Sequence, residues 1–170
     1  GPQLLVLGDD VAAGAGAWCW NGWGSRLAAA LHSRFGYGVS GHVGDGMDVY
    51  KAEKDFEQLT SASPKPLVVL LAFSAGLTHV ATCPEWDREP SATAFLQALE
   101  GLVAKVFQAG AYPVIAGLCP HGACGPEHAP IWRRTNDRMK GLGVPALDWL
   151  HLLCASYHDG AWAEGLSWDG

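Results

Sequence analysis

The sequence has little charge and no run of basic residues. Only 16% of its 170 residues are charged, and 11 Lys and Arg are outnumbered by 17 Asp and Glu, which gives a net charge of −6. Proteins that bind nucleic acid normally carry a basic patch or stripe, so this composition argues against a nucleic-acid partner. No apolar run approaches the ~20 residues that span a bilayer, so we expect no membrane span.

Cysteine is also sparse, and its five residues are an odd number. They do not form the dense framework of a disulfide-stabilised domain. Cys119 and Cys124 are close enough in sequence to pair in an oxidising compartment, and with His121 and His128 they offer four metal-binding side chains. Their spacing, Cys-x-His-x2-Cys-x3-His, matches no common zinc motif, so free thiols are favoured over a disulfide or zinc. We expect no metal and no cofactor.

Apolar residues are plentiful, at 49% of the chain, and the length suits one domain with a substantial core over residues 1–170. Short apolar runs alternate with segments of helical period, which is typical of βαβ units and a parallel sheet. The run 66–73 is apolar without alternation, as in a central strand covered on both faces. The fold class is therefore α/β, with strands expected at 3–8, 38–43, 66–73, 112–118 and 144–148.

The clearest expected helix is 91–109, where apolar residues recur at spacings of three and four. Ser91 is its expected N-cap, and Gly110 is its expected stop. Glycine and proline gather in the expected loops 12–24, 83–90 and 119–130. The other helices are expected at 22–34, 48–59, 127–141 and 149–157.

In open parallel sheets, ligand sites lie outside the carboxyl ends of the strands. We therefore expect any site here to be built from the segments 8–10, 43–46 and 73–76 and the loop after Cys119. Asp9 is expected to accept hydrogen bonds from backbone N–H groups of its own turn. For Asp10, the same local role and a position facing the site are both open.

Two further features near this edge leave alternatives open. Asp45, Asp48 and Asp169 could join Asp10 in a carboxylate cluster that holds a hard cation, although no ligand-spacing motif supports this. Trp18, Trp20 and Trp23 follow Asp10 closely, and form either a platform for a sugar or partner, or packing that covers the sheet. The other tryptophans are expected mainly to pack: Trp86, Trp132, Trp149, Trp162 and Trp168.

Several segments, in order, resemble the sequence blocks of the SGNH (GDSL-type) hydrolases. Residues 5–14 are similar to the first block, a strand followed by Gly-Asp-Ser, and 23–31 to the helix after it. Segment 42–46 resembles the second block, and 66–77 occupies the third. Residues 136–148 look like the family's late helix and fifth strand, and residues 166–170 look like the start of the fifth block, Asp-x-x-His-Pro.

This resemblance implies a three-layer α/β/α sandwich of the flavodoxin-like type with a five-stranded parallel sheet. It also implies an activity on esters, acetylated sugars, lipids or thioesters. By the resemblance, Asp10 stands at the nucleophile position, Gly44, Gly46 and Ala75 stand at oxyanion positions, and Asp169 opens the fifth block.

The sequence departs from that family pattern at three places. Asp10 replaces the serine, so it has no hydroxyl, and its charge would oppose the charge that forms on the substrate oxygen. Ala75 replaces an asparagine donor, and the loss of one such donor typically costs ~10²–10³ in rate. The histidine expected three residues after Asp169 would fall beyond Gly170, and we expect none of the seven histidines to replace it.

These departures together predict a catalytically impaired hydrolase-like domain, a pseudoenzyme, that binds a small-molecule ester, a carbohydrate or a protein partner. One alternative is an active esterase or acyl-hydrolase whose histidine lies beyond residue 170. Another is a structural subunit of a larger assembly, in which the domain's own tryptophans fill the position of the family's active site. The compartment is not determined by the sequence.

Overall fold

The computed structural model describes residues 1–13, 23–44, 46–61, 65–73, 88–118 and 129–153. Within these ranges, five parallel strands form one sheet in the order β2-β1-β3-β4-β5. The predicted α/β class and five-stranded parallel sheet are confirmed, and each strand overlaps its predicted range. The strands are β1 (Gln3–Gly8), β2 (Gly38–Val43), β3 (Val68–Ala72), β4 (Tyr112–Ala116) and β5 (Ala146–Leu147).

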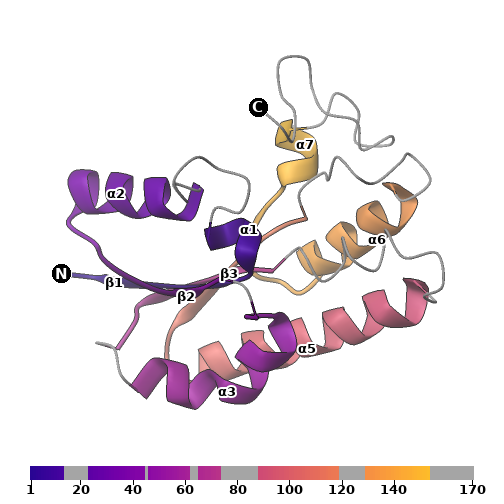
Figure 1. The fold of residues 1–170 in the computed structure, drawn as a ribbon, viewed down its shortest axis with the longest axis horizontal. Coiled ribbons are helices and arrows are strands. Elements are labelled where there is room, and N and C mark those ends of the chain that lie inside the picture. Colours follow the sequence, from indigo (N-terminus) through magenta and orange to yellow (C-terminus); the bar gives the residue numbers. More distant parts are fainter. Residues whose placement is uncertain (14–22, 45, 62–64, 74–87, 119–128, 154–170) are drawn as a thin grey trace.

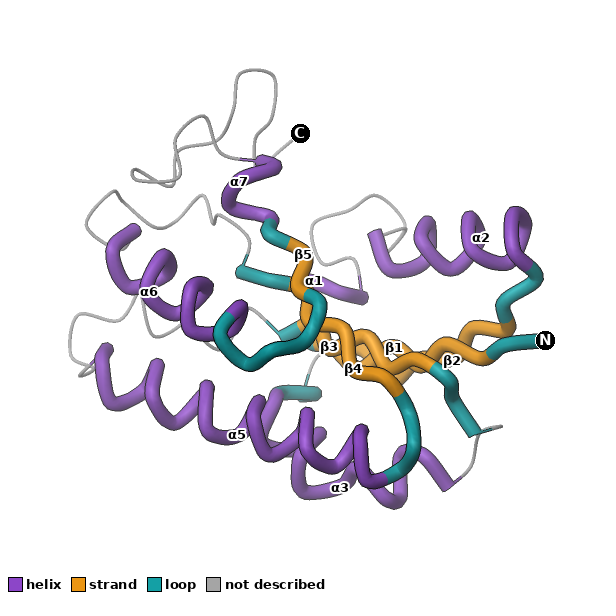
Figure 2. Tube along the Cα trace, turned by 180° about the vertical axis from the view of Figure 1, so that it is seen from behind, coloured by secondary structure: helices purple, strands orange, loops and turns teal. Residues whose placement is uncertain are grey.

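Helices cover both faces of this sheet. Figures 1 and 2 show α3 and α5 side by side on one face and α2 on the other. None of the helices in the described ranges has the length and hydropathy of a transmembrane segment. The helices are α1 (Asp10–Ala13), α2 (Trp23–Phe35), α3 (Val49–Ser61), α5 (Arg88–Gln108), α6 (Ala129–Lys140) and α7 (Trp149–Leu153).

The interior strand β1 contributes side chains to both cores, because successive side chains of a strand point to opposite faces. Leu5 and Leu7 enter the larger core, which also contains residues of α3, α5 and α6. Leu4 and Val6 enter a smaller core, where residues of α1, α2 and α7 pack. A strand buried on both faces needs an uninterrupted apolar run, which is what β1 and β3 have.

The predicted start of α5 is wrong, whereas its predicted end is confirmed. The helix begins at Arg88, so Ser91 is inside its first turn and is not its N-cap. Pro90 is tolerated there because the first N–H groups of a helix have no partner within the helix. Gly110 has a φ of 76°, and its N–H donates to the Phe107 carbonyl at 2.9 Å, which ends the helix as predicted.

The remaining helices agree with their predicted ranges to within a few residues. The exception is α1, because residues 12 and 13 were expected in a loop and belong to a one-turn helix. Four residues are too few to give a recognisable helical period. Residues 154–157, which were predicted to continue α7, lie outside the described residues.

Gly8, the last residue of β1, provides a test of how this sheet edge is packed. A Cβ at this position would lie 2.6 Å from the Ala12 Cβ and 2.8 Å from the Ala72 carbonyl oxygen. We expect Gly8→Ala to lower the free energy of unfolding by about 1–3 kcal/mol, because the backbone must move to relieve the overlap. Urea denaturation followed by circular dichroism measures this loss.

Gly41 on the neighbouring strand is the matched control. Its added Cβ would meet its nearest atom, the Val6 carbonyl oxygen, at 3.4 Å, an ordinary contact distance. Gly41→Ala should therefore leave the free energy of unfolding nearly unchanged. Equal losses of unfolding free energy in the two variants would show that the crowding around Gly8 does not destabilise the Gly8→Ala variant.

Candidate active site

The ends of three neighbouring strands meet at the carboxyl edge of the sheet. Gly8 of β1 is paired with Val43 of β2 and with Ala72 of β3. The Asp9 N–H donates to the Ala72 carbonyl at 3.3 Å, and the Gly44 N–H donates to the Gly8 carbonyl at 3.4 Å. The residues that directly follow β1 and β2 are therefore hydrogen-bonded to the ends of the neighbouring strands, at the edge where the sequence predicted a site.

Asp9 caps the short helix that leaves this edge. Its side chain is 5% exposed, and its Oδ1 accepts a hydrogen bond from the Ala12 N–H at 3.4 Å. Its carbonyl accepts a second bond from the Ala13 N–H at 3.1 Å. The predicted local role of Asp9 is confirmed, because these bonds satisfy N–H groups of the first turn of α1.

Asp10 follows this cap as the first residue of α1. Its backbone therefore lies two residues beyond Gly8, at the point where the chain leaves the sheet. This is the position that the sequence resemblance assigns to the nucleophile.

The two predicted oxyanion glycines have backbone conformations that favour glycine. The φ angles are 139° at Gly44 and 83° at Gly46, and a Cβ added at either residue would meet no atom within 4 Å. Backbone conformation, rather than crowding, is what favours glycine here. The N–H of Gly44 already donates to the Gly8 carbonyl, whereas no such bond is recorded for Gly46 among the described residues.

Other predicted site residues lie outside the described residues. These are Ala75, Asp45 and Asp169, the tryptophans Trp18 and Trp20, and the Cys119–His128 segment with its proposed thiols. Their roles therefore stay predictions. Trp86, Trp162 and Trp168, which were expected to pack, also lie outside these ranges.

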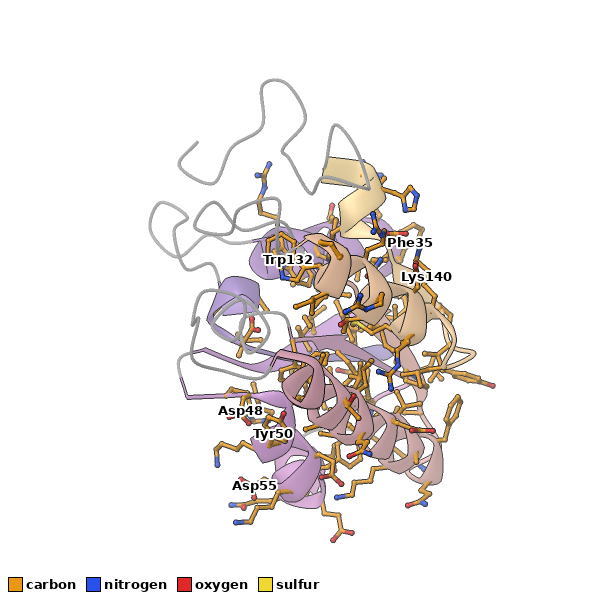
Figure 3. All side chains as sticks on the ribbon, turned by 90° about the vertical axis from the view of Figure 1, so that its right-hand side faces the viewer. Phe35, Asp48, Tyr50, Asp55, Trp132 and Lys140 are labelled. Atoms are coloured by element: carbon orange, nitrogen blue, oxygen red, sulfur yellow. The ribbon has the colours of Figure 1, made fainter. Side chains whose placement is uncertain are left out.

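Asp48, a predicted member of the carboxylate cluster, caps α3. Its Oδ1 accepts from the Lys51 N–H at 2.7 Å, and its carbonyl accepts from the Ala52 N–H at 2.9 Å (Figure 3). Within the described part of the chain, no three His, Cys, Asp or Glu side chains gather in a way that could hold a metal ion. The observed role of Asp48 is thus to start a helix.

Trp23 packs against the domain's own residues. Its ring centroid lies 5.7 Å from that of Trp149, with the planes tilted by 56°, and both rings border the smaller core. This favours the packing interpretation for Trp23. Trp132 is 2% exposed, so the packing predicted for Trp132 and Trp149 is confirmed (Figure 3).

A carboxylate–imidazole pair that the sequence analysis missed lies just after β5. The Asp148 Oδ2 is 2.6 Å from the His151 Nδ1 and 2.5 Å from the Lys140 Nζ. The Asp148 Oδ1 accepts from the buried Asn136 Nδ2 at 3.0 Å. Three side chains therefore contact one carboxylate. One of them, Lys140, is labelled in Figure 3.

We expected none of the seven histidines to replace the family's histidine, but one aspartate–histidine pair does have the family's spacing. Asp148-Trp-Leu-His151 has the Asp-x-x-His spacing. The sequence contained a signal for it, since an aspartate just before a helix commonly caps it, and Asp148 does accept from the His151 N–H at 3.3 Å.

The electrostatics of Asp148 favour its charged form. Burial opposes ionisation, but hydrogen bonds from Lys140, His151 and Asn136 outweigh it and hold the pKa of the Asp148 carboxyl below its usual value. The Asp148 side chain is 20% exposed, whereas that of His151 is 57% exposed. An ionised carboxylate that orients an accessible imidazole is an arrangement suited to proton transfer.

No family model and no curated protein matches this sequence. Solved structures match it closely in three dimensions. AlinE4, an SGNH-hydrolase family esterase, superposes with a TM-score of 0.69 and 15% identity, over 89% of this chain and 78% of its own. The acetyl xylan esterase AlAXEase gives 0.67 and 15%, over 86% and 77%. The psychrotrophic esterase EstA from Pseudoalteromonas sp. gives 0.66 and 17%, over 89% and 79%.

The lowered pKa of Asp148 predicts how its contribution to stability depends on pH. A carboxyl whose pKa is lower in the folded protein stabilises fully above its unfolded pKa, about 3.9, and the stabilisation is lost as pH falls through the folded pKa. We expect Asp148→Ala to lower the free energy of unfolding by about 1–3 kcal/mol at pH 7, because a helix cap and the partner of buried Asn136 are lost. This deficit should shrink as the pH falls below about 4.

Denaturation at several pH values measures that deficit. Asp137→Ala is the matched control, because Asp137 is an exposed carboxylate 3.5 Å from the same Lys140 Nζ. Its effect should stay below about 1 kcal/mol. A deficit at Asp148 that does not change between pH 7 and pH 3 would contradict the role assigned to its charge.

Proposed function

We propose that this chain, which has the fold of the SGNH-hydrolase esterases, uses the carboxyl edge of its sheet to bind an ester or acetylated carbohydrate without efficient hydrolysis. One observation supports this above the others. The first residue of α1, directly after the buried cap Asp9, is an aspartate at the nucleophile position implied by the resemblance.

The chemistry of a carboxylate explains why such a site would hydrolyse esters poorly. If Asp10 attacked an ester carbonyl, the new bond would form an anhydride and an alkoxide would leave. An anhydride is more reactive than the ester, so the equilibrium favours the starting ester. A negative charge at Asp10 would also repel the oxyanion that forms during attack by any other nucleophile.

The expected oxyanion donors support the same proposal. The Gly44 N–H, which the resemblance offers as an oxyanion donor, is already donating to the Gly8 carbonyl. The residue proposed for the third block, Ala75, has no side-chain donor. Stabilisation of an oxyanion needs preorganised donors, so the proposed site would bind a neutral ester better than its transition state.

The neighbours of this fold suggest which ligand class to test first. One matching structure is described as an acetyl xylan esterase, which makes acetylated carbohydrate a reasonable first ligand to test. A protein partner or a structural role in a larger assembly would appear as an absence of binding to such ligands.

Hydrolysis of p-nitrophenyl acetate tests the proposal directly. We expect the native chain, Asp10→Ser and Asp10→Asn all to remain within a few-fold of the uncatalysed rate, because the substitution restores neither the oxyanion donor nor a base. Calorimetric titration with an acetylated xylo-oligosaccharide should show binding to all three. Steady turnover by the native chain would refute the proposed impairment.

A second candidate function, an active acyl-hydrolase, is favoured by the Asp148–His151 pair. The carboxylate orients the accessible imidazole, so His151 could accept a proton from a water molecule as that water attacks an ester carbonyl. The tetrahedral intermediate would then expel the alcohol, which takes the proton back from the imidazole.

Substitution of the histidine distinguishes this second candidate. His151→Gln should reduce any hydrolysis of p-nitrophenyl acetate to the uncatalysed rate, because glutamine cannot accept a proton from the attacking water. His32→Gln is the matched control, because His32 is another exposed histidine whose Nδ1 contacts a backbone carbonyl, that of Tyr37, at 3.0 Å. Equal effects of the two substitutions would eliminate His151 as a base.

A further inference from the structure

The two edges of the sheet differ in length. At one edge, β5 has only two residues, which leaves little backbone to pair with another strand. At the other edge, β2 has six residues, Gly38-Val-Ser-Gly-His-Val43, without proline and without a carboxylate, lysine or arginine. Natural proteins usually protect edge strands with charges, proline or short length, and β2 has none of these.

The backbone bonds at the two ends of β2 show which of its residues face outward. The Gly38 N–H donates to the Pro2 carbonyl at 2.9 Å, and the Gly44 N–H donates to the Gly8 carbonyl at 3.4 Å. In a parallel strand, alternate residues direct their N–H and C=O groups to the same neighbour. The even-numbered residues therefore face β1, and Val39, Gly41 and Val43 direct theirs away from the sheet.

The outward N–H and C=O groups of these three residues have no backbone hydrogen-bond partner among the described residues. Gly41 and Val43 are also exposed, with the Val43 side chain at 39%. Figures 1 and 2 show α2 and α3 on opposite faces of the sheet. The outer edge of β2 is therefore a row of backbone donors and acceptors without charged side chains.

We propose that this edge pairs with the β2 edge of a second copy of the chain, antiparallel and centred on Gly41. Only outward residues can exchange hydrogen bonds, and centring the pair on Gly41 allows all three outward residues of β2 to do so. Gly41 then lies opposite its own copy on the two-fold axis, and Val39 lies opposite Val43 of the partner subunit. Such pairing extends the two sheets into one continuous sheet.

The side chains of β2 fit a second copy of the same strand. Val39, Gly41 and Val43 share the face of the smaller core, since they are paired with Leu4, Val6 and Gly8. Valine therefore meets valine across the interface, and glycine occupies the axis. Ser40 and His42 meet on the other face, where the His42 Nε2 contacts the Leu59 carbonyl at 3.1 Å. The residues of β2 themselves bring no carboxylate or ammonium groups together.

Sedimentation equilibrium measures this association. Between about 1 µM and about 100 µM, the mean mass of the native chain should rise from 18.0 kDa toward twice that value. Val43→Lys should weaken the association roughly tenfold or more, because two lysines would enter one small interface. Leu152→Lys is the matched control, since Leu152 is an exposed apolar residue on α7, at 64%, and its change should have no effect.

Amide hydrogen exchange tests the register independently of the mass. The amides of Ser40 and His42 should be protected at every concentration, because they bond to β1. Those of Val39, Gly41 and Val43 should gain protection only as the concentration rises. A chain that stays monomeric at 100 µM, a dimer that Val43→Lys leaves intact, or protection without this alternation would each overturn the proposal. The outcomes of these two association experiments are independent of the hydrolysis assays, since β2 pairing involves neither Asp10 nor His151.

Discussion

The close approach of three backbone segments at Gly8 determines the geometry of the carboxyl edge. Any side chain at this residue would overlap Ala12 of α1 and the Ala72 carbonyl of β3. Glycine therefore lets the chain turn directly from β1 into α1 while β3 stays paired beside it. Asp9 can then reach the first turn of α1 as its cap, and Asp10 follows at the start of the helix. The position of the proposed ligand site is thus a consequence of packing around one small residue.

Two aspartates that follow strands of this sheet have different environments. Asp9 is buried, and its Oδ1 accepts from the Ala12 N–H of the turn that follows it. Asp148 is partly exposed and is held by Lys140, Asn136 and His151, which stabilise its charge. Both aspartates therefore cap a helix, but Asp148 is also the centre of a charged cluster. The difference arises from α6, which brings a lysine and an asparagine to the end of β5.

Particular elements show how far the sequence could predict the fold and the site. The ranges of β1 and β3 were predictable, because strands buried on both faces need continuous apolar runs. The end of α5 was predictable, because Gly110 readily adopts the positive φ of a helix stop. The start of α5 and the short α1 were not, because proline is allowed in a first turn and four residues show no helical period. The Asp148–His151 spacing was visible in the sequence, but its partners were not.

The sequence by itself determined the local features of this protein: the apolar strands, the main helices and the glycine turns. Each depends on a few neighbouring residues, so composition and periodicity reveal it. Only the tertiary structure decided that Trp23 packs on Trp149 and that Lys140 and Asn136 converge on Asp148. It also decided which backbone groups of β2 face outward. These features depend on how separate segments are placed by the sheet order, and no local pattern contains that order.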